Sequence, residues 1–361
     1  MKIILVAGAV LSLGQISQGC AIMSPEMQQD TSISTTDEAA LIVWDEKTKT
    51  EHFIRRASFS GATKEFGFMV PTPSKPSLGE TKEGLFEALE EEVKPEIKTQ
   101  IDREYRFFAF FGNSGEEFES AATSTPKAEA AGDEDVQVIE QTRVGDYDAT
   151  VLRADDAKAL GEWLRKNSYT ATPSVEKWLQ FYTDKKWYLT AFKVRANREN
   201  QNASLAPVRI SFETAKPFYP YHEPETAQKN PIERSLRVFF VGEKRTGADV
   251  VSPAKSEKWA GETTYSSNLK NSSGIEELGG LPTGQKLEAN GKRLTTFVDY
   301  STPRRGFGDL YFSPSDEQRE ILPEPIINHK EQTIFIPLDL IGLVLLGIFA
   351  YRRFQPSESR E

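Results

Sequence analysis

Residues 39–59 read AALIVWDEKTKTEHFIRRASF, and this stretch sets the expected fold. An apolar run over residues 39–44 precedes a polar, turn-like tetrapeptide at Asp45–Thr48, and polar and apolar residues then alternate as far as Phe59. Because the side chains of a strand point alternately to its two faces, the two segments predict a β-hairpin with a buried face.

Short segments with strand character recur along the chain. A third strand over Phe66–Val70 meets Pro71, Pro73 and Pro76, which lack the N–H that a strand ladder uses, so we expect pairing to end there. The turn Val144–Asp146 predicts a second hairpin. Further strands, the first of them buried, are expected over 105–111, 136–140, 147–153, 187–194, 208–212, 236–241, 263–266, 294–298 and 310–312.

Helical spacing of apolar residues appears in two places. Leu85, Phe86, Leu89 and Val93 predict a core-facing helix over 82–93. Between 155 and 183 we expect two helices, the first capped by Asp155 or Asp156 and the second started by Pro173. Strands outnumber helices, and the helices cluster, which predicts an α+β fold with mostly antiparallel sheet and a few packed helices.

The composition bounds the class of protein. The chain has 361 residues, of which 38% are apolar and 11% aromatic, enough for one large domain or two ordinary ones. The net charge is −10, which argues against nucleic-acid binding because that function needs a basic face. Cys20 is the single cysteine, so an internal disulfide and a cysteine-based metal site are excluded.

The N-terminus has the architecture of a signal peptide over residues 1–20. Lys2 precedes an apolar segment of about 12 residues, which is too short to span a bilayer. Gly19-Cys20 is similar to the end of a bacterial lipobox, although Ser17 stands where that motif usually has leucine. Cys20 is therefore a candidate lipidation site, and the alternative is ordinary signal-peptidase cleavage nearby.

The C-terminus predicts one transmembrane helix over residues 334–354. Pro337 suits a first helical turn, and Asp339 falls where the helix dipole favours an anion. Arg352 and Arg353 close the apolar run and belong on the cytoplasmic side. A buried soluble helix is the alternative.

The two ends of the chain predict its domain organisation and its cellular localisation. We expect a bacterial single-pass membrane protein with the bulk of the chain extracytoplasmic, either periplasmic or on the cell surface. The expected segments are a spacer at 21–38, an extracytoplasmic region at 39–312 with a flexible insert at 112–135, a stalk at 313–333 and a cytoplasmic tail at 355–361.

Signatures of catalysis are sparse. The three histidines, His52, His222 and His329, lack the spacing of a metal site, and no nucleophile elbow, P-loop or dinucleotide fingerprint is present. We therefore expect no cofactor and no metal. The aromatic residues Phe218, Tyr219 and Tyr221 lie between prolines, which predicts an exposed contact surface.

The chain resembles DUF2330, a bacterial family of unknown function, over roughly residues 39–220. The resemblance rests first on three strand segments, ALIVWD (40–45), TEHFIR (50–55) and FGFMVPTP (66–73). It continues with VGDY (144–147) and the pairs VL (151–152), AL (159–160) and WL (163–164), and then with WYLTAFK (187–193) and PVRISF (207–212). Members resemble exported proteins, often with a C-terminal membrane segment, and several cysteines near the mature N-terminus are a feature that this chain lacks. The resemblance implies no activity and no catalytic residues.

Two functions remain from the sequence. The first is a non-catalytic binding or structural module of the cell envelope, which would contact the membrane and an envelope protein or polymer. The alternative is a cell-envelope hydrolase that uses paired carboxylates. The scarcity of catalytic motifs favours the first.

Overall fold

The computed structural model describes residues 22–23, 34–60, 66–108, 137–169, 171–194, 206–225, 234–281 and 291–353. The chain divides into two compact units, one formed by Met1–Lys94 and Pro126–Pro323 and the other by Pro95–Thr125 and Glu324–Glu361. The predicted signal peptide, the predicted insert at 112–135 and the predicted tail at 355–361 lie outside the described residues.

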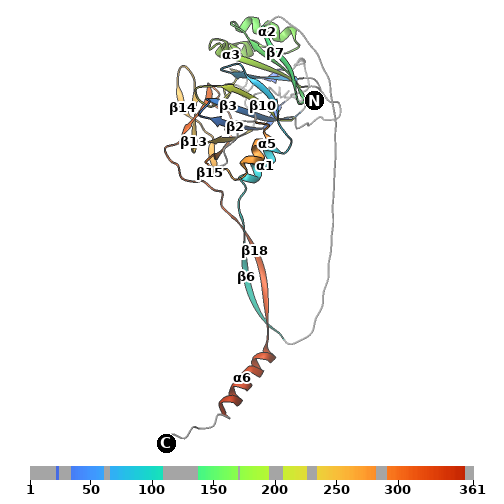
Figure 1. Cartoon of the computed structure of the whole chain (residues 1–361), viewed down its shortest axis with the longest axis vertical. Helices are drawn as coiled ribbons and strands as arrows, with labels where there is room; N and C mark the ends of the chain where they lie inside the picture. The colour runs from blue at the N-terminus through green and yellow to red at the C-terminus, as the bar shows by residue number, and fades with distance from the viewer. Residues whose placement is uncertain are drawn as a thin grey trace, which may run out of the picture. The chain divides into compact units, whose positions relative to one another are not determined.

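A seven-stranded sheet forms the centre of the larger unit (Figure 1). Its strands, in spatial order, are β15 (Glu262–Asn268), β16 (Arg293–Asp299), β12 (Ser235–Gly242), β2 (Ser34–Asp45), β3 (Thr50–Ser60), β10 (Val208–Glu213) and β5 (Ser77–Glu80). The hairpin predicted from residues 39–59 is confirmed as β2 and β3, which pair antiparallel with Val43 opposite His52. β2 begins at Ser34, so it takes in the end of the expected spacer.

Two smaller sheets complete the larger unit. One has the order β1 (Ile22–Met23), β4 (Phe66–Thr72), β9 (Tyr188–Val194), β8 (Tyr147–Arg153) and β7 (Gln137–Val144). The other has the order β11 (Phe218–Tyr219), β17 (Asp309–Pro314), β13 (Thr246–Val251) and β14 (Ser256–Lys258). Among the described strands of this unit, pairing is antiparallel except between β2 and β12. The antiparallel-rich α+β class is therefore confirmed.

Pro71 does not end the third strand. β4 continues to Thr72, and Pro71 lies opposite Leu189 of β9. The second neighbour, β1, pairs only with Gly67 and Phe68, so Pro71 lies where one side of β4 has no partner among the described strands. Proline is tolerated in such an edge position because its missing N–H is not needed there.

The described residues of the larger unit form four helices that pack on its sheets, namely α1 (Leu85–Glu92), α2 (Ala157–Lys166), α3 (Pro173–Thr183) and α5 (Ser272–Leu278). The expected starts of α2 and α3 are confirmed: Asp156 Oδ2 accepts from the Ala159 backbone N–H, and Pro173 follows the cap Thr172. α1 begins later than expected, after Gly84, which has φ +86°. That left-handed conformation suits glycine and ends helical geometry on its N-terminal side.

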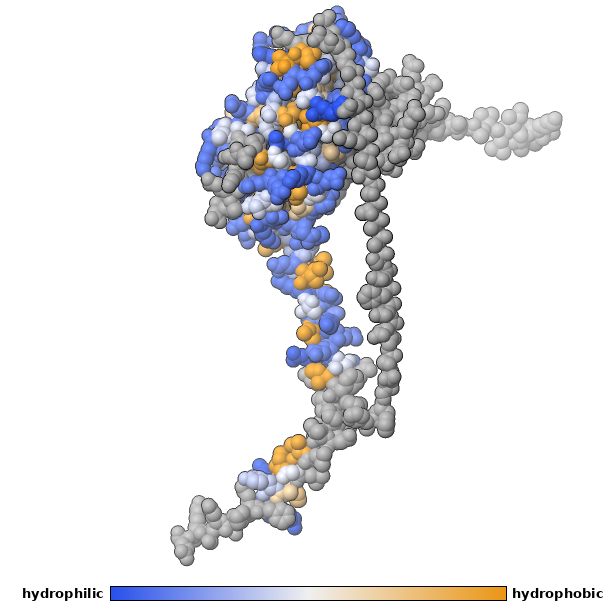
Figure 2. Space-filling view, turned by 45° about the vertical axis from the view of Figure 1, so that its right-hand side comes forward, coloured by the Kyte–Doolittle hydropathy of each residue, from blue (hydrophilic) through white to orange (hydrophobic). Residues whose placement is uncertain are grey.

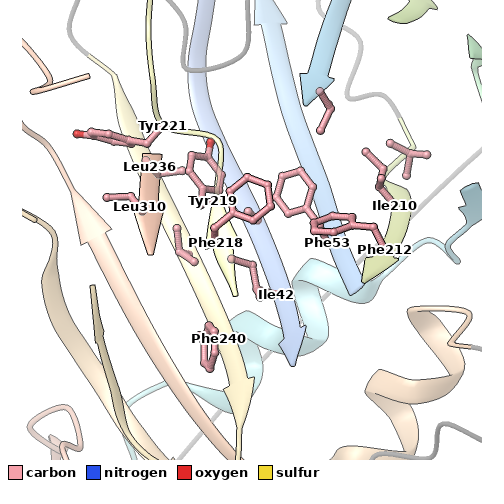
Figure 3. Packing of buried hydrophobic residues seen from close by; sticks show 14 of the residues in the cluster. Ile42, Phe53, Ile210, Phe212, Phe218, Tyr219, Tyr221, Leu236, Phe240 and Leu310 are labelled. Atoms are coloured by element: carbon pink, nitrogen blue, oxygen red, sulfur yellow. The ribbon is translucent and has the colours of Figure 1, made fainter. Parts of the chain in front are cut away.

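The main core lies among the three sheets of the larger unit. Ile42, Phe53 and Phe240 from the seven-stranded sheet share one cluster with residues of the other two sheets (Figure 3). Phe218 and Leu310, both at most 1% exposed, come from the four-stranded sheet. Burial of these rings removes a large apolar area from water, which is the main favourable term in folding.

The smaller unit contains a two-stranded ribbon and a helix (Figure 1). β6 (Ile97–Phe108) and β18 (Ile326–Pro337) pair in parallel over their whole length, and α6 (Leu338–Arg353) follows directly. The expected strand at 105–111 therefore begins earlier, at Ile97. Residues 97–104, which precede the predicted segment, include exposed apolar side chains, since Ile97 is 71% and Ile101 50% exposed. The burial predicted for 105–111 falls on side chains outside the described part of the chain. Within the expected stalk at 313–333, residues 313–314 lie in β17, which belongs to the larger unit, and residues 326–333 lie in β18.

Within the part of the chain that the structure describes, no helix combines the length and the apolar content needed to cross a membrane. α6 has 16 residues and ends at Arg353. The predicted transmembrane helix at 334–354 is thus not supported in that form, because residues 334–337 belong to β18.

Candidate functional site

The predicted contact surface at Phe218, Tyr219 and Tyr221 is wrong, because these side chains are at most 1% exposed. β11 pairs antiparallel with β17, with Phe218 opposite Tyr311, and this pairing draws the segment into the main core (Figure 3). Of the other predicted residues, Asp339, Arg352 and Arg353 lie on α6, and Cys20 lies outside the described residues.

The buried aromatic residues belong to an internal charge network. Glu38 Oε1 accepts hydrogen bonds from Arg55 Nε at 2.9 Å and from the Tyr219 hydroxyl at 2.5 Å, and Glu38 Oε2 lies 3.5 Å from Arg304 Nη1. All four residues are at most 4% exposed. Burial raises the pKa of Glu38, but the charges of Arg55 and Arg304 outweigh it and lower this pKa to about 2.

Two further carboxylates are held in the same region. Asp299 Oδ2 accepts from the Tyr221 hydroxyl at 2.7 Å and from Trp259 Nε1 at 3.0 Å. Glu223 accepts from Arg234, and both of these side chains are at most 3% exposed. Carboxylates that are buried and neutralised in this way cannot reach a substrate. The network therefore has a structural role, and breaking one partner would leave an uncompensated buried charge.

A polar cavity of about 460 Å³ lies beside strands β3 and β10 and has a histidine and a serine in its wall. His52 Nδ1 lies 2.8 Å from Ser211 Oγ, and the two residues are direct cross-strand partners. β10 is paired on both sides, with β3 and with β5. The backbone N–H groups of paired strands are not free to stabilise an oxyanion, so this mid-strand position lacks a common feature of serine hydrolase sites.

A second cavity, of about 360 Å³, is the strongest candidate site, and we call it the Lys185 cavity. Its wall combines the α3–β9 turn, the β10–β11 loop, the β13–β14 turn and strand β17. The residues that line it are Lys185, Lys216, Val251, Ser252, Pro253 and Tyr311. This size and this mixture of apolar walls with a few polar groups are typical of sites for small molecules.

Asp309 and several aromatic rings contact the ammonium group of Lys185. Its Nζ lies 3.6 Å from Asp309 Oδ2, 3.5 Å from the Phe181 ring centroid and 4.7 Å from the Trp187 ring centroid. Asp309 is fully buried, and its Oδ1 accepts hydrogen bonds from the Tyr182 hydroxyl at 2.8 Å and from the His222 backbone N–H at 3.2 Å. These contacts fix the ammonium group at the cavity wall.

Several titratable groups around the Lys185 cavity have perturbed pKa values. Burial lowers the pKa of Lys185, although Asp309 partly opposes this effect, and burial raises the pKa of Asp309 itself. Burial also lowers the pKa of His222 to about 4, and the nearby charge of Lys185 adds to this. Burial and the charge of Asp309 raise the pKa of Tyr311. Such clusters occur more often at functional sites than elsewhere.

The protonation states that follow define what the cavity offers a ligand. At neutral pH the phenol of the lining residue Tyr311 keeps its proton and can donate it in a hydrogen bond, and the imidazole of His222, which does not line the cavity, is uncharged. Lys216 is exposed and adds a second ammonium group at the cavity wall. None of the six lining residues is acidic.

A metal site is not formed by the residues that the structure describes: no group of three His, Cys, Asp or Glu side chains lies close enough together there. His329 lies 2.6 Å from Asp102, between β18 and β6, and both side chains are largely exposed. The expectation that the protein needs no cofactor remains a prediction.

Comparison with known families identifies the chain. Residues 16–306 match the family described as "Uncharacterized protein conserved in bacteria (DUF2330)", and the chain belongs to this family. The resemblance inferred from the strand and helix segments is thereby confirmed, and the match extends well beyond residue 220. No curated protein matches the chain.

Among solved structures, those of baculovirus P35 are similar at a low level. The crystal structure of baculovirus P35 has 9% sequence identity and a TM-score of 0.34, with 82% of this chain and 97% of that chain covered. The crystal structure of the caspase-8/P35 complex has 10% identity and a TM-score of 0.32, with 81% and 96% covered. Likeness at this level carries no inference about this protein.

Proposed function

We propose that this protein is a membrane-anchored, extracytoplasmic module of the bacterial cell envelope that binds a ligand or partner and has no catalytic activity. The observation that carries the proposal is the surface of α6. Val344, Leu345, Ile348 and Phe349 are between 49% and 62% exposed, and Figure 2 shows apolar residues on this helix. An exposed apolar helix is costly in water and favourable in lipid.

The length of α6 is close to that of a membrane-spanning helix, and the residues that flank its apolar part can make up the difference. Sixteen residues at 1.5 Å each give about 24 Å, which is shorter than a hydrocarbon core of about 30 Å. Arg352 and Arg353, in the last turn, can extend their charged groups toward the headgroups and reduce the mismatch. The same arginines favour a cytoplasmic C-terminus, which leaves the rest of the chain outside the cytoplasm.

The described carboxylates favour a binding or structural role over the alternative, a hydrolase with paired carboxylates. Such an enzyme needs two carboxyl groups that face each other across a cleft. The buried residues Glu38 and Glu223 are engaged by arginines. Of the two cavities described above, one is lined by Glu213 and the other by no acidic residue, so neither provides a pair.

Fractionation of cells tests the anchor. We expect the full chain in the membrane fraction after an alkaline carbonate wash, and a variant that lacks residues 334–361 in the soluble fraction. The double variant Leu345→Lys/Phe349→Lys should also be released, whereas Glu331→Lys, an exposed charge change in β18, should stay with the membrane.

If the carbonate wash removes the full chain from the membrane fraction, the proposal that α6 is a membrane anchor is wrong. If the truncated variant stays with the membrane, Cys20→Ala separates a lipid at Cys20 from other attachment. Protease added to intact spheroplasts tests the orientation, because the body should be cleaved from outside like a control ectodomain.

A further inference from the structure

We propose that the Lys185 cavity binds a small organic carboxylate with an apolar body. The inference deepens the proposed function, since it names the class of ligand that the binding module takes. It does not depend on whether α6 is an anchor, because the six lining residues all belong to the larger unit.

The charge of the cavity selects an anion. Lys185 and Lys216 contribute two positive charges to the wall, and Asp309, behind Lys185, contributes one negative charge. The two basic side chains outnumber the one acidic side chain, which favours a carboxylate, and an ammonium group binds a carboxylate through charge-assisted hydrogen bonds. A cationic ligand would be repelled by both lysines.

The geometry of Lys185 favours such a ligand. Its side chain lines the cavity and is 27% exposed, and Asp309 and the Phe181 ring contact its ammonium group from one side. An ammonium group that is already fixed loses little conformational freedom when a ligand binds. The Tyr311 hydroxyl provides a neutral donor in the same wall.

The rest of the wall selects an apolar body. Val251, Pro253 and the ring of Tyr311 offer carbon surface, and the cavity has few other polar groups. A sugar would leave its hydroxyl groups without partners against this surface, which costs binding energy. A free phosphate would fill little of the 360 Å³ and would carry more charge than the cavity balances.

Titration of the detergent-solubilised full chain tests the proposal, with phenylacetate as the probe and ligand-observed NMR as the readout. Phenylacetamide has the same shape without the charge and should bind at least about tenfold more weakly, which is the effect of one charged hydrogen bond. Inorganic phosphate should not displace phenylacetate at equal concentration.

Three variants locate the binding. Lys185→Met should weaken phenylacetate binding about tenfold or more, and the exposed Lys216→Met should weaken it about fivefold. Lys186→Met is the matched control: Lys186 is adjacent in sequence and 70% exposed but does not line the cavity, so affinity should not change. Lys216→Met keeps the test valid if Lys185→Met fails to fold, because Lys216 has no role in the core.

Several results would overturn the proposal. These are equal binding of phenylacetate and phenylacetamide, no saturable binding of phenylacetate, displacement by phosphate, or wild-type affinity in Lys216→Met. Fractionation results do not enter this test, so a failure of the anchor and a failure of the ligand site are distinguishable.

Discussion

Arg55 on β3 donates a hydrogen bond through Nε to Glu38 Oε1 on β2, and both side chains are only 2% exposed. The two residues are not direct cross-strand partners, since Ala40 lies opposite Arg55. The ion pair thus crosses the central hairpin diagonally on the face that carries the main core. A buried pair adds little net stability by itself, but loss of one partner is costly.

Glu38→Ala should lower the free energy of unfolding by about 3–5 kcal/mol, because Arg55 and Arg304 would lose the buried carboxylate that both contact. Urea denaturation of the purified protein measures this change. Glu46→Ala is the control, since Glu46 is 58% exposed and pairs with Lys49 at 3.7 Å, so its effect should stay within about 0.5 kcal/mol. Equal effects of both variants would contradict the buried network.

Acid should remove the contribution of Glu38. Its pKa in the folded state is about 2, against an ordinary value of 4.5, so folding favours the ionised form. The stabilisation is present above pH 4.5 and is lost as the pH falls toward 2. The stability difference between the wild type and Glu38→Gln should therefore shrink over this range in urea titrations at successive pH values. A difference that stays constant would exclude the depressed pKa.

Glu51 should show the opposite behaviour. Burial raises its pKa well above 4.5, despite the hydrogen bond that it accepts from the Phe218 backbone N–H. The folded state then holds a proton that the unfolded chain releases, so stability falls as the pH rises above 4.5. Glu51→Gln should be more stable than the wild type at pH 8 and lose that advantage near pH 4. A less stable variant at both pH values would contradict this.

Tyr182→Phe should lower the free energy of unfolding by about 1.5–3 kcal/mol, because Asp309 would lose a buried hydrogen bond of 2.8 Å. Thermal and urea denaturation measure the loss. Tyr300→Phe provides a control with 71% exposure and should leave stability unchanged. No change in Tyr182→Phe would show that Asp309 is satisfied without the tyrosine.

Local signals in the sequence predicted the elements that their own residues specify. The apolar run and the turn of residues 39–59 define the β2–β3 hairpin, and Asp156 and Pro173 mark the starts of α2 and α3. Each depends on neighbours within a few positions, such as a cap that satisfies a backbone N–H three residues later. This information is present in a single sequence.

Elements supported by distant partners were missed. β13, β14 and α5 lie in a polar stretch without clear periodicity, and β13 gains its order from pairing with β17. The exposed strand β6 pairs with β18, more than 200 residues later, and nothing local indicates that pairing. Tertiary contacts override weak local preference in these cases.

The candidate site was missed for the same reason. Lys185, Lys216 and Tyr311 come from a helix end, a loop and a strand, and no spacing in the sequence connects them. The sequence shows the aromatic residues Phe218 and Tyr219, but it does not show that they are buried, because their burial depends on pairing with β17. No single-sequence motif marks this cavity.

The parallel pairing of β2 with β12 has a consequence for biosynthesis. Val43 lies opposite Val241, so a ribosome must translate about two thirds of the polypeptide before the central strand can acquire its second neighbour. Until then one edge of the apolar strand β2 has unpaired backbone N–H and C=O groups. Such an edge can pair with strands of other chains, which favours aggregation. Holdase chaperones that shield this segment during synthesis should therefore raise the yield of native protein.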